Sequence, residues 1–438
     1  MDNYVCGRCG KEFSEESKFD RHIKRVRPCK KKPVETMKFI DLCCGIGGFH
    51  YALKNMGFEC VLASDINKEC RENYEMNHGI KPEGDLTLIP LEKIPDFDVL
   101  CAGFPCQPFS KAGEQGGFSD SRGNIFFEIC KIVEKRSPKY MILENVKNLA
   151  THDKGNTWSV IRRQIDVLGY WTYDKPIILN TLFFGVPQSR ERVVILCKRK
   201  DLGELKGLPA ISKKDCKPTS LESIIESEVV DEKYWLSDKM KVVESVWGEF
   251  IEMCWDKGIK IPKFPIWTEW WDNENAQYSG EEERESAIQF YQKYKNWIDK
   301  NREFYQKNKT HLSRWLVKAR DQELWKGAVR KMEWQVKSET RVGIKDLLWS
   351  PRGSGIRIKD VDYSPTLVAM ASMIPIYGPK SRHLTLRECA RLQSFPEEYI
   401  YSRDKTAYTQ FGNAVNVKMI ERSARFLING EELLELGG

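Results

Sequence analysis

The sequence lacks any apolar run of the roughly 18 residues that a membrane-spanning helix needs. Its first residues, MDNYVCGRCG, also lack the basic and then apolar layout of a secretory signal peptide. The first absence excludes a membrane-spanning helix, and the second predicts an intracellular chain. In a reducing compartment the 14 cysteines are expected to be free thiols, metal ligands or a catalytic thiol rather than disulfides.

A large excess of charge of one sign is also absent, since the formal net charge is only +7 over 438 residues. The distribution says more than the total, because one short N-terminal segment is strongly basic and contains no acid. Such a run is compatible with a solvated tail or with a patch that contacts phosphates. It consists of Arg21, Lys24, Arg25, Arg27, Lys30, Lys31 and Lys32.

Residues 1–32 contain cysteines and a histidine at the spacing of a small zinc site. A Cys-x2-Cys knuckle, a histidine on a short helix and a later cysteine would form a closed tetrahedral shell, although chance free cysteines remain an alternative. The unit is too small to fold on apolar burial alone, so metal binding is expected to drive its folding. It resembles two-Cys, two-His zinc fingers with the last histidine replaced. The adjoining basic run favours nucleic acid as its partner, with protein binding as the alternative. The expected structural Zn²⁺ ligands are Cys6, Cys9, His22 and Cys29.

From residue 37 to about 200, apolar strands alternate with helices. The strands are expected within KFIDL, ECVLASDI, DFDVLCAGFP, KYMILENV and ERVVILCKRK. This alternation predicts an α/β fold with a mostly parallel sheet covered on both faces. Ligands of such sheets bind at the carboxyl ends of the strands, where Gly45 to Gly48, Asp65, Asp85, Cys106 and Glu144 all fall.

The glycine-rich segment CCGIGG follows the first of these strands. Asp65 lies at the distance from Gly45 at which an acid reaches ribose hydroxyls in nucleotide-binding βαβ units. The turn has the form G-x-G-G rather than G-x-G-x-x-G, so a nucleoside-containing cofactor is favoured over a dinucleotide. A glycine-rich turn that binds no ligand is the alternative, since it would have the same sequence pattern.

The stretch CAGFPCQPFS places Cys101 within an apolar strand and Cys106 between two prolines. Cys106 alone could be a buried filler, half of a disulfide, a metal ligand or a nucleophile. The compartment argues against a disulfide, and the CxxxxC spacing without a nearby histidine argues against a metal. Cys101 is expected to be a core residue.

An ordered series of motifs resembles the DNA (cytosine-5)-methyltransferase family, and is similar to its bacterial restriction-modification members. The series lies in two blocks, 37–200 and about 363–430. Its motifs are FIDLCCGIGGF, GFPCQPFS, ENV at 144–146, QSRERV at 188–193, RECARLQSFP at 387–396 and QFGNAV at 410–415.

The resemblance implies a Rossmann-like fold that binds S-adenosylmethionine. Asp65 would take the ribose hydroxyls and Asp85 the adenine amino group, while the C-terminal block would fold back and complete the pocket. Relatives usually carry a phenylalanine at the position of Cys43, so one aromatic contact with the adenine is expected to be missing. The implied cofactor residues are Gly45, Ile46, Gly47, Gly48, Asp65, Ile66, Asp85, Leu86, Pro105, Gly412, Asn413 and Ala414.

The resemblance also implies a covalent mechanism. The Cys106 thiolate would add to carbon 6 of cytosine, which makes carbon 5 nucleophilic. Protonated Glu144 would bind ring nitrogen 3, Arg192 would donate to the 2-keto oxygen, and Arg190 would orient the carboxylate and the loop. The base must leave the duplex stack, and the glycine-rich loop after Cys106 would close over it.

Residues 201–362 contain 11 of the 13 tryptophans, interleaved with lysine and arginine. The family keeps its target-recognition domain here, although most of these tryptophans are expected to form a core. Arg352 and Arg357 are candidates for contacts in a DNA groove. The expected domains are a zinc-finger-like module (1–32), the catalytic and cofactor-binding core (37–200), the target-recognition domain (201–362) and a C-terminal block that completes the core (363–438).

We therefore expect a monomeric DNA cytosine-5 methyltransferase that acts on double-stranded DNA, in the cytoplasm or on the nucleoid of a bacterial or viral system. A second hypothesis is tRNA methylation, which the long recognition region disfavours. A third is a non-catalytic DNA-binding regulator, against which the intact set of Cys106, Glu144, Arg190 and Arg192 argues.

Overall fold

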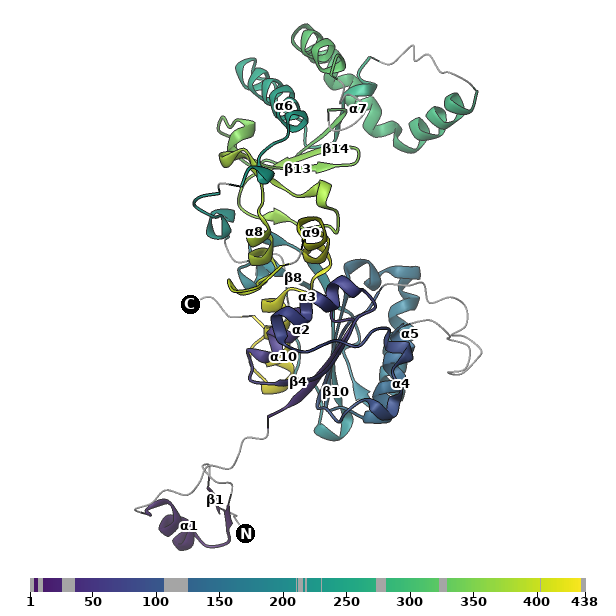
Figure 1. Cartoon of the computed structure of the whole chain (residues 1–438). Helices are drawn as coiled ribbons and strands as arrows, with labels where there is room; N and C mark the ends of the chain where they lie inside the picture. Colours follow the sequence, from purple (N-terminus) through teal and green to yellow (C-terminus); the bar gives the residue numbers. More distant parts are fainter. Residues whose placement is uncertain are drawn as a thin grey trace.

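The computed structural model of the chain describes residues 4–6, 11–25, 36–105, 125–209, 211, 216, 219–229, 231–272, 281–322, 329–401 and 403–434. The first element is a small ββα unit, in which β1 (Tyr4–Val5) pairs antiparallel with β2 (Glu12–Phe13) and α1 (Glu16–Ile23) follows. Two larger units, each built on a sheet, make up the rest (Figure 1).

The first large unit contains a seven-stranded sheet in the order β4-β3-β5-β6-β10-β7, with β8 paired to β10. Three pairings among β3, β4, β5 and β6 are parallel, and the three pairings of β10 are antiparallel. The sheet is therefore mixed, and the expectation of a mostly parallel sheet is not confirmed. A parallel crossover needs about a dozen residues or more, and the link from β8 to β10 is too short for one. The strands are β3 (Lys38–Leu42), β4 (Glu59–Ser64), β5 (Val99–Gly103), β6 (Tyr140–Val146), β7 (Tyr170–Trp171), β8 (Ile177–Asn180) and β10 (Glu191–Arg199).

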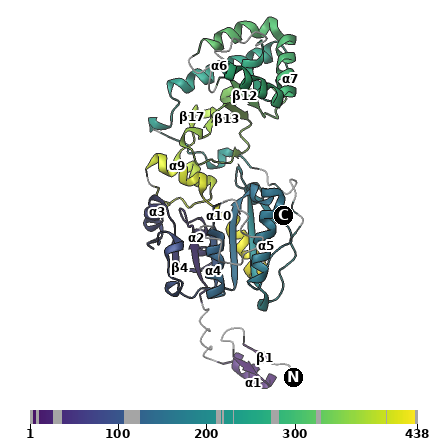
Figure 2. The same cartoon turned by 90° about the vertical axis from the view of Figure 1, so that its right-hand side faces the viewer.

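Helices cover both faces of this sheet. Successive strand residues point to opposite faces, and apolar residues on both faces are buried against helices. Phe39 and Cys101 share one core with α2 (Gly48–Lys54), α3 (Lys68–His78) and α10 (Val417–Asn429). Ile40 shares the other core with α4 (Ile125–Arg136) and α5 (Asn156–Val167), as Figures 1 and 2 show. The assignment of Cys101 to the core is confirmed.

The second large unit has a six-stranded sheet, in the order β11-β12-β14-β13-β16-β17, and two long helices. A short parallel pair, β9 (Gln188–Ser189) with β15 (Ser364–Pro365), lies outside both large sheets. The elements of the second unit are α6 (Asp238–Asp256), β11 (Ile266–Trp267), α7 (Glu281–Arg320), β12 (Lys331–Trp334), β13 (Leu348–Arg352), β14 (Gly355–Lys359), β16 (Ile376–Tyr377) and β17 (Arg382–His383).

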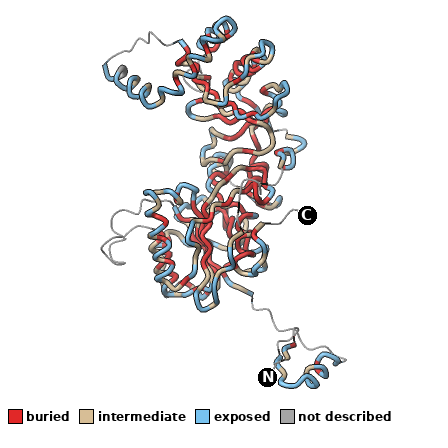
Figure 3. Tube along the Cα trace, turned by 180° about the vertical axis from the view of Figure 1, so that it is seen from behind, coloured by how far each residue is buried: buried red, intermediate tan, exposed pale blue. Residues whose placement is uncertain are grey.

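Most tryptophans of the second unit are buried, as expected from their number. Figure 3 shows the buried residues concentrated in the sheets of both large units. Trp235 and Trp297 are exceptions, with exposed fractions of 57% and 42%. The buried ones are Trp247, Trp267, Trp270, Trp271, Trp315, Trp334 and Trp349.

The boundaries of the second unit differ from the expected limits of 201 and 362. Strands β16 and β17 extend its sheet to His383, whereas Leu221 and Ile224 belong to the core of the first unit. Three helices, α8 (Leu386–Leu392), α9 (Asp404–Asn413) and α10, then return to the first unit. Within the described ranges, no helix has the length and apolar character required to cross a bilayer.

Candidate active site

A cleft of about 920 Å³ opens at the carboxyl ends of β3, β4, β5 and β6. Helix α9 (Asp404–Asn413) and the two residues after it form the opposite wall, so the two sequence blocks meet there. Every predicted cofactor residue except Gly47 lines the cleft, together with Glu144 and Arg192. The predicted cofactor residues in the lining are Gly45, Ile46, Gly48, Asp65, Ile66, Asp85, Leu86, Pro105, Gly412, Asn413 and Ala414.

The glycine turn connects β3 to α2 and is shaped by its neighbours. Gly47 has a φ of +85°, and a Cβ there would overlap the imidazole ring of His78, whose Cδ2 would lie 2.9 Å away. The His78 ring in turn stacks on His50 at a centroid distance of 3.7 Å. At Gly45, by contrast, a Cβ would meet no atom within 4 Å, so the backbone there is open to a ligand.

Two carboxylates that follow β4 face the cleft. Asp65 accepts hydrogen bonds from the backbone N–H groups of Gly45 (2.8 Å) and Asn67 (2.8 Å), and burial raises its pKa. Asp85 Oδ1 accepts from the backbone N–H (2.9 Å) and hydroxyl (2.8 Å) of Thr87. Its Oδ2 has no protein partner in the described part of the chain, and so is available to a ligand.

Glu144 lies at the end of β6 and forms an ion pair with Arg192, on the neighbouring strand β10. The distance from Arg192 Nε to Glu144 Oε1 is 2.9 Å, and both side chains are about nine-tenths buried. Burial raises the pKa of the Glu144 carboxyl, and the positive charges of Arg192 and Arg190 oppose that rise only in part. Burial also lowers the pKa of Arg192. The site therefore favours a Glu144 carboxyl that takes up a proton more readily than a free glutamate.

Arg190 has a different position from the one its motif suggested. Its side chain is fully buried, is absent from the cleft lining, and has a pKa lowered to about 9 by burial. Nη1 donates to the carbonyl oxygens of Gly412 (3.1 Å) and Leu367 (3.4 Å), and Nη2 donates to that of Ala414 (2.7 Å). Arg190 thus connects β10 to the C-terminal block instead of orienting the Glu144 carboxylate directly.

Two buried glutamines, which sequence reasoning did not single out, make related contacts: Gln188 connects to the C-terminal block, and Gln393 joins two segments within that block. Gln188 donates to the carbonyl of Leu392 (2.8 Å) and accepts from the N–H of Leu367 (3.1 Å). Gln393 donates to the carbonyl of Phe411 (2.9 Å). Both glutamines lie within the recognised motifs, and this position was the only sequence signal for them.

Asn145, on β6, holds the segment after the neighbouring strand β5, which leads to the predicted nucleophile Cys106. Its Nδ2 donates to the carbonyl of Phe104 (2.8 Å), and its Oδ1 accepts from the N–H of Val146 (2.9 Å). Phe104 and Pro105 line the cleft, whereas Cys106 and the predicted closing loop lie outside the described residues. Asn145 is a second group that sequence reasoning missed.

Comparison with known proteins now connects this geometry to a family. Residues 37–429, and so both walls of the cleft, match the C-5 cytosine-specific DNA methylases. The chain belongs to this family.

Individual relatives agree with the family match. The chain is 32% identical to the Type II methyltransferase M.BanI of Aneurinibacillus aneurinilyticus, over 88% of this chain and 94% of that protein. It is 50% identical to M.HhaI of Haemophilus parahaemolyticus, but over only 40% of this chain and 52% of that protein. A structure of the Entamoeba histolytica methyltransferase EhMeth covers 90% of this chain and 99% of its own, with a TM-score of 0.51 and 12% identity, and supports the fold alone.

In this C-5 cytosine-specific DNA methylase, the glycine turn begins with two cysteines, Cys43 and Cys44. Cys43, where the resemblance implied a missing aromatic contact, lines the cleft and has a φ of +52°. Phe104 is the one aromatic among the described lining residues, and only 4% of its surface is exposed. Ile66 instead offers an apolar side chain that is 77% exposed. Ile66 is therefore the most exposed large apolar side chain among the described lining residues.

The methylase match begins at residue 37, so the N-terminal ββα unit is additional to it. Cys6 and His22 are both buried to 4% exposure in that unit, and the rings of Phe13 and His22 lie 4.9 Å apart. The other two predicted zinc ligands, Cys9 and Cys29, lie outside the described residues. Within the described ranges, no cluster of three or more histidine, cysteine or acidic side chains is arranged to hold a metal.

Proposed function

We propose that this chain transfers the methyl group of S-adenosylmethionine to carbon 5 of a cytosine flipped out of double-stranded DNA. The observation that carries the proposal is the buried Glu144–Arg192 pair, in the same cleft as Asp65 and Asp85 and next to the strand end that leads to Cys106. The cleft fits the donor, since it combines an open glycine backbone with two carboxylates suited to hydroxyl and amino groups. When bound there, S-adenosylmethionine supplies an electrophilic methyl group.

The chemistry requires a soft nucleophile, and we assign that role to Cys106. Its thiolate forms a bond to carbon 6, which shifts the ring electrons so that carbon 5 attacks the methyl group. The bond between that methyl group and the donor sulfur breaks, and its electron pair stays on the sulfur of the departing thioether. A base, for which water suffices, then removes the proton from carbon 5. The electron pair of that C–H bond restores the double bond to carbon 6 and expels the Cys106 thiolate.

Glu144 and Arg192 bind the ring while charge develops on it. In its protonated form, which burial favours, Glu144 donates to ring nitrogen 3. Arg192 uses Nε for Glu144, which leaves other N–H groups for the 2-keto oxygen. Arg190 keeps the C-terminal wall of the cleft in place.

The second large unit supplies the DNA-binding surface in this proposal. One chain contains every group that the reaction needs, so we propose a monomer. Type II methyltransferases among the relatives suggest that the methyl mark distinguishes host DNA in a bacterial restriction-modification system.

We further propose that the ββα unit binds one structural Zn²⁺ through Cys6, Cys9, His22 and Cys29. A buried thiol and a buried imidazole in so small a unit support this assignment. Metal analysis of the purified chain should find about one zinc ion, which Cys6→Ala loses and the matched variant Cys216→Ala retains. A wild-type chain without zinc would contradict the assignment.

Bisulfite sequencing of plasmid DNA from cells that express the chain tests the methylation proposal. We expect modified cytosines within one short sequence, and none with Cys106→Ser. Unmodified plasmid together with cytosine-5 methylated tRNA would show that the substrate is tRNA and not DNA. If neither nucleic acid is modified, the enzymatic proposal fails.

A further inference from the structure

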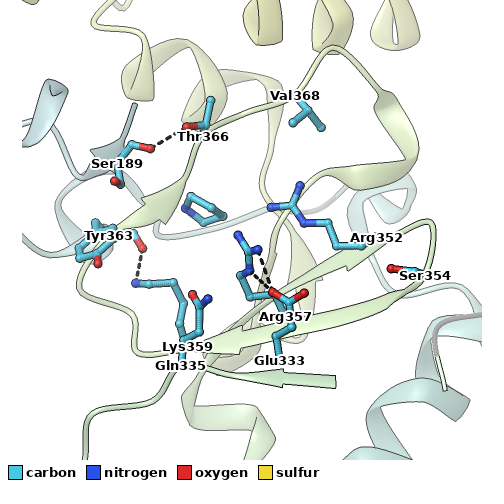
Figure 4. Close-up of a pocket in the computed structure, with 11 residues that line it drawn as sticks. Ser189, Glu333, Gln335, Arg352, Ser354, Arg357, Lys359, Tyr363, Thr366 and Val368 are labelled. Carbon is cyan, nitrogen blue, oxygen red and sulfur yellow. Dashed lines mark hydrogen bonds and ion pairs between the residues drawn. The ribbon is translucent and has the colours of Figure 1, made fainter. Parts of the chain in front are cut away.

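A second cavity, of about 500 Å³, lies where the second large unit meets the β9–β15 pair (Figure 4). One wall comes from β12, β13 and β14, and the other comes from residues around Ser189 and Thr366. Thr366 Oγ1 donates to the carbonyl of Ser189 at 2.7 Å, which joins β9 to the segment after β15. Because Ser189 immediately precedes Arg190, the cavity adjoins the strand that leads to the active site.

Most charged groups of this cavity already have protein partners. Arg357 donates to Glu333 through Nε (2.9 Å) and Nη2 (2.8 Å), and Lys331 donates to the other carboxylate oxygen of Glu333 (3.0 Å). Lys359 donates to the carbonyl of Tyr363 (2.6 Å) and to the Asp362 carboxylate. These contacts satisfy the cations without any ligand.

Arg352 differs from these cations, because it has no protein partner among the described residues. It ends β13, and Figure 4 shows its side chain extending into the cavity toward Arg357. No described residue accepts a hydrogen bond from its guanidinium, and its Nε is buried without a partner. Burial, and secondly the charge of Arg357, lower its pKa. A partly buried guanidinium without a partner, next to a second one, favours a ligand that supplies acceptors.

The side chains of the cavity wall indicate whether the ligand is a DNA phosphate or the groove edge of a base pair. A phosphate offers acceptors only, so the nearby Glu333 carboxylate would repel it. A base pair in the major groove offers acceptors and donors side by side, and Glu333, Gln335 and Arg352 together present both kinds of group. The two acceptors on the groove edge of guanine match the planar fork of arginine.

We propose that Arg352 recognises a guanine within the DNA sequence that this enzyme methylates. The inference rests on the proposed function, which it deepens by naming a residue that determines specificity. Arg357, the other groove candidate from the sequence, is held by Glu333 and positions the wall. Arg352 therefore reads the base, and Arg357 supports it.

The test compares bisulfite profiles of a random-sequence plasmid library modified by wild type, Arg352→Gln and Arg352→Lys. For the wild type we expect a preference of roughly 5- to 150-fold for one G·C pair. Both variants should lose that preference at that pair only, because glutamine lacks the charge and lysine lacks the fork. Arg341→Gln, an exposed arginine of the same unit that pairs with Asp256, is the matched control and should leave the profile unchanged.

Each other outcome overturns the inference. Unchanged specificity in both variants would show that Arg352 does not read a base. A uniform loss across all sequences, with a salt dependence of binding reduced by about one phosphate contact, would assign Arg352 to the backbone. A wild type that modifies no cytosine in the library would instead refute the proposed function, so the two failures are distinguishable.

Discussion

Gly412→Ala is the substitution for which the structure makes its sharpest prediction. Gly412 lies in the last turn of α9, against the segment that contains Val368. A Cβ at this position would lie 2.5 Å from both the Val368 carbonyl oxygen and the Ala369 nitrogen, and closer still to the Val368 carbonyl carbon. All three are backbone atoms, so no side chain can rotate away.

The magnitude follows from two opposing effects. Ordinary van der Waals contact begins near 3.4 Å, so the two segments must separate by about 1 Å. Overpacking of this kind typically costs about 1–3 kcal/mol, while alanine improves helix propensity by up to about 1 kcal/mol. We expect a net loss of roughly 1–2 kcal/mol in the free energy of unfolding. The shift also moves the Gly412 carbonyl away from Arg190, and moves Asn413 and Ala414 in the cleft wall.

Urea unfolding and a titration with S-adenosylmethionine measure the two consequences. We expect a lower unfolding midpoint and a cofactor affinity weakened by about 5- to 30-fold, which corresponds to 1–2 kcal/mol. Gly207→Ala is the matched control, since Gly207 is exposed and a Cβ there meets no atom within 4 Å. If Gly412→Ala were as stable as the wild type and bound the cofactor equally well, the close approach of the two segments would be refuted.

Two further predictions concern carboxyl groups. Glu144→Gln should lower the single-turnover methylation rate by about 10²- to 10⁴-fold, with exposed Glu134→Gln as control. The wild-type rate should fall as pH rises through the raised pKa of Glu144, and a rate that stays flat would contradict a protonated donor. Burial holds the pKa of Asp41 in the folded chain well above its ordinary value of 3.8. Between the ordinary and the raised pKa, the folded chain binds a proton on Asp41 that the unfolded chain does not bind. The contribution of Asp41 to the free energy of unfolding therefore falls as pH rises through this interval. Urea unfolding at several pH values should therefore show that the free energy of unfolding declines less steeply with pH for Asp41→Asn than for the wild type. The same pH dependence in both proteins would refute the raised pKa of Asp41.

The sequence was sufficient to predict the carboxylates and the glycine turn of the cleft, but not Asn145. Asp65 follows β4 and Glu144 lies near the end of β6, and the carboxyl ends of parallel strands meet at one edge of a sheet. Asp85 lies beyond α3, and its role was implied by the family resemblance. Gly45 could be predicted for the same reason, since a glycine turn after a strand leaves open backbone at that edge.

Other features depend on contacts between distant segments, which a motif does not reveal. Arg192 on β10 faces the cleft, whereas Arg190 lies between β9 and β10 and is buried against the C-terminal block, although alternation along one strand would place residues two apart on the same face. The antiparallel direction of β10 and the extension of the second sheet to His383 likewise follow from tertiary pairing. The stacked pair of His50 and His78 below the glycine turn had no sequence signal.

The most direct test of the account is to trap the Cys106 adduct on DNA that contains 5-fluorocytosine at the target position. Fluorine at carbon 5 cannot leave as a proton does, so the thiolate should remain bonded to carbon 6 after methyl transfer. The account predicts a covalent protein–DNA complex that requires S-adenosylmethionine, with the nucleotide attached to the peptide that contains Cys106. Attachment to another residue, or methylation of ordinary DNA by Cys106→Ser, would contradict it.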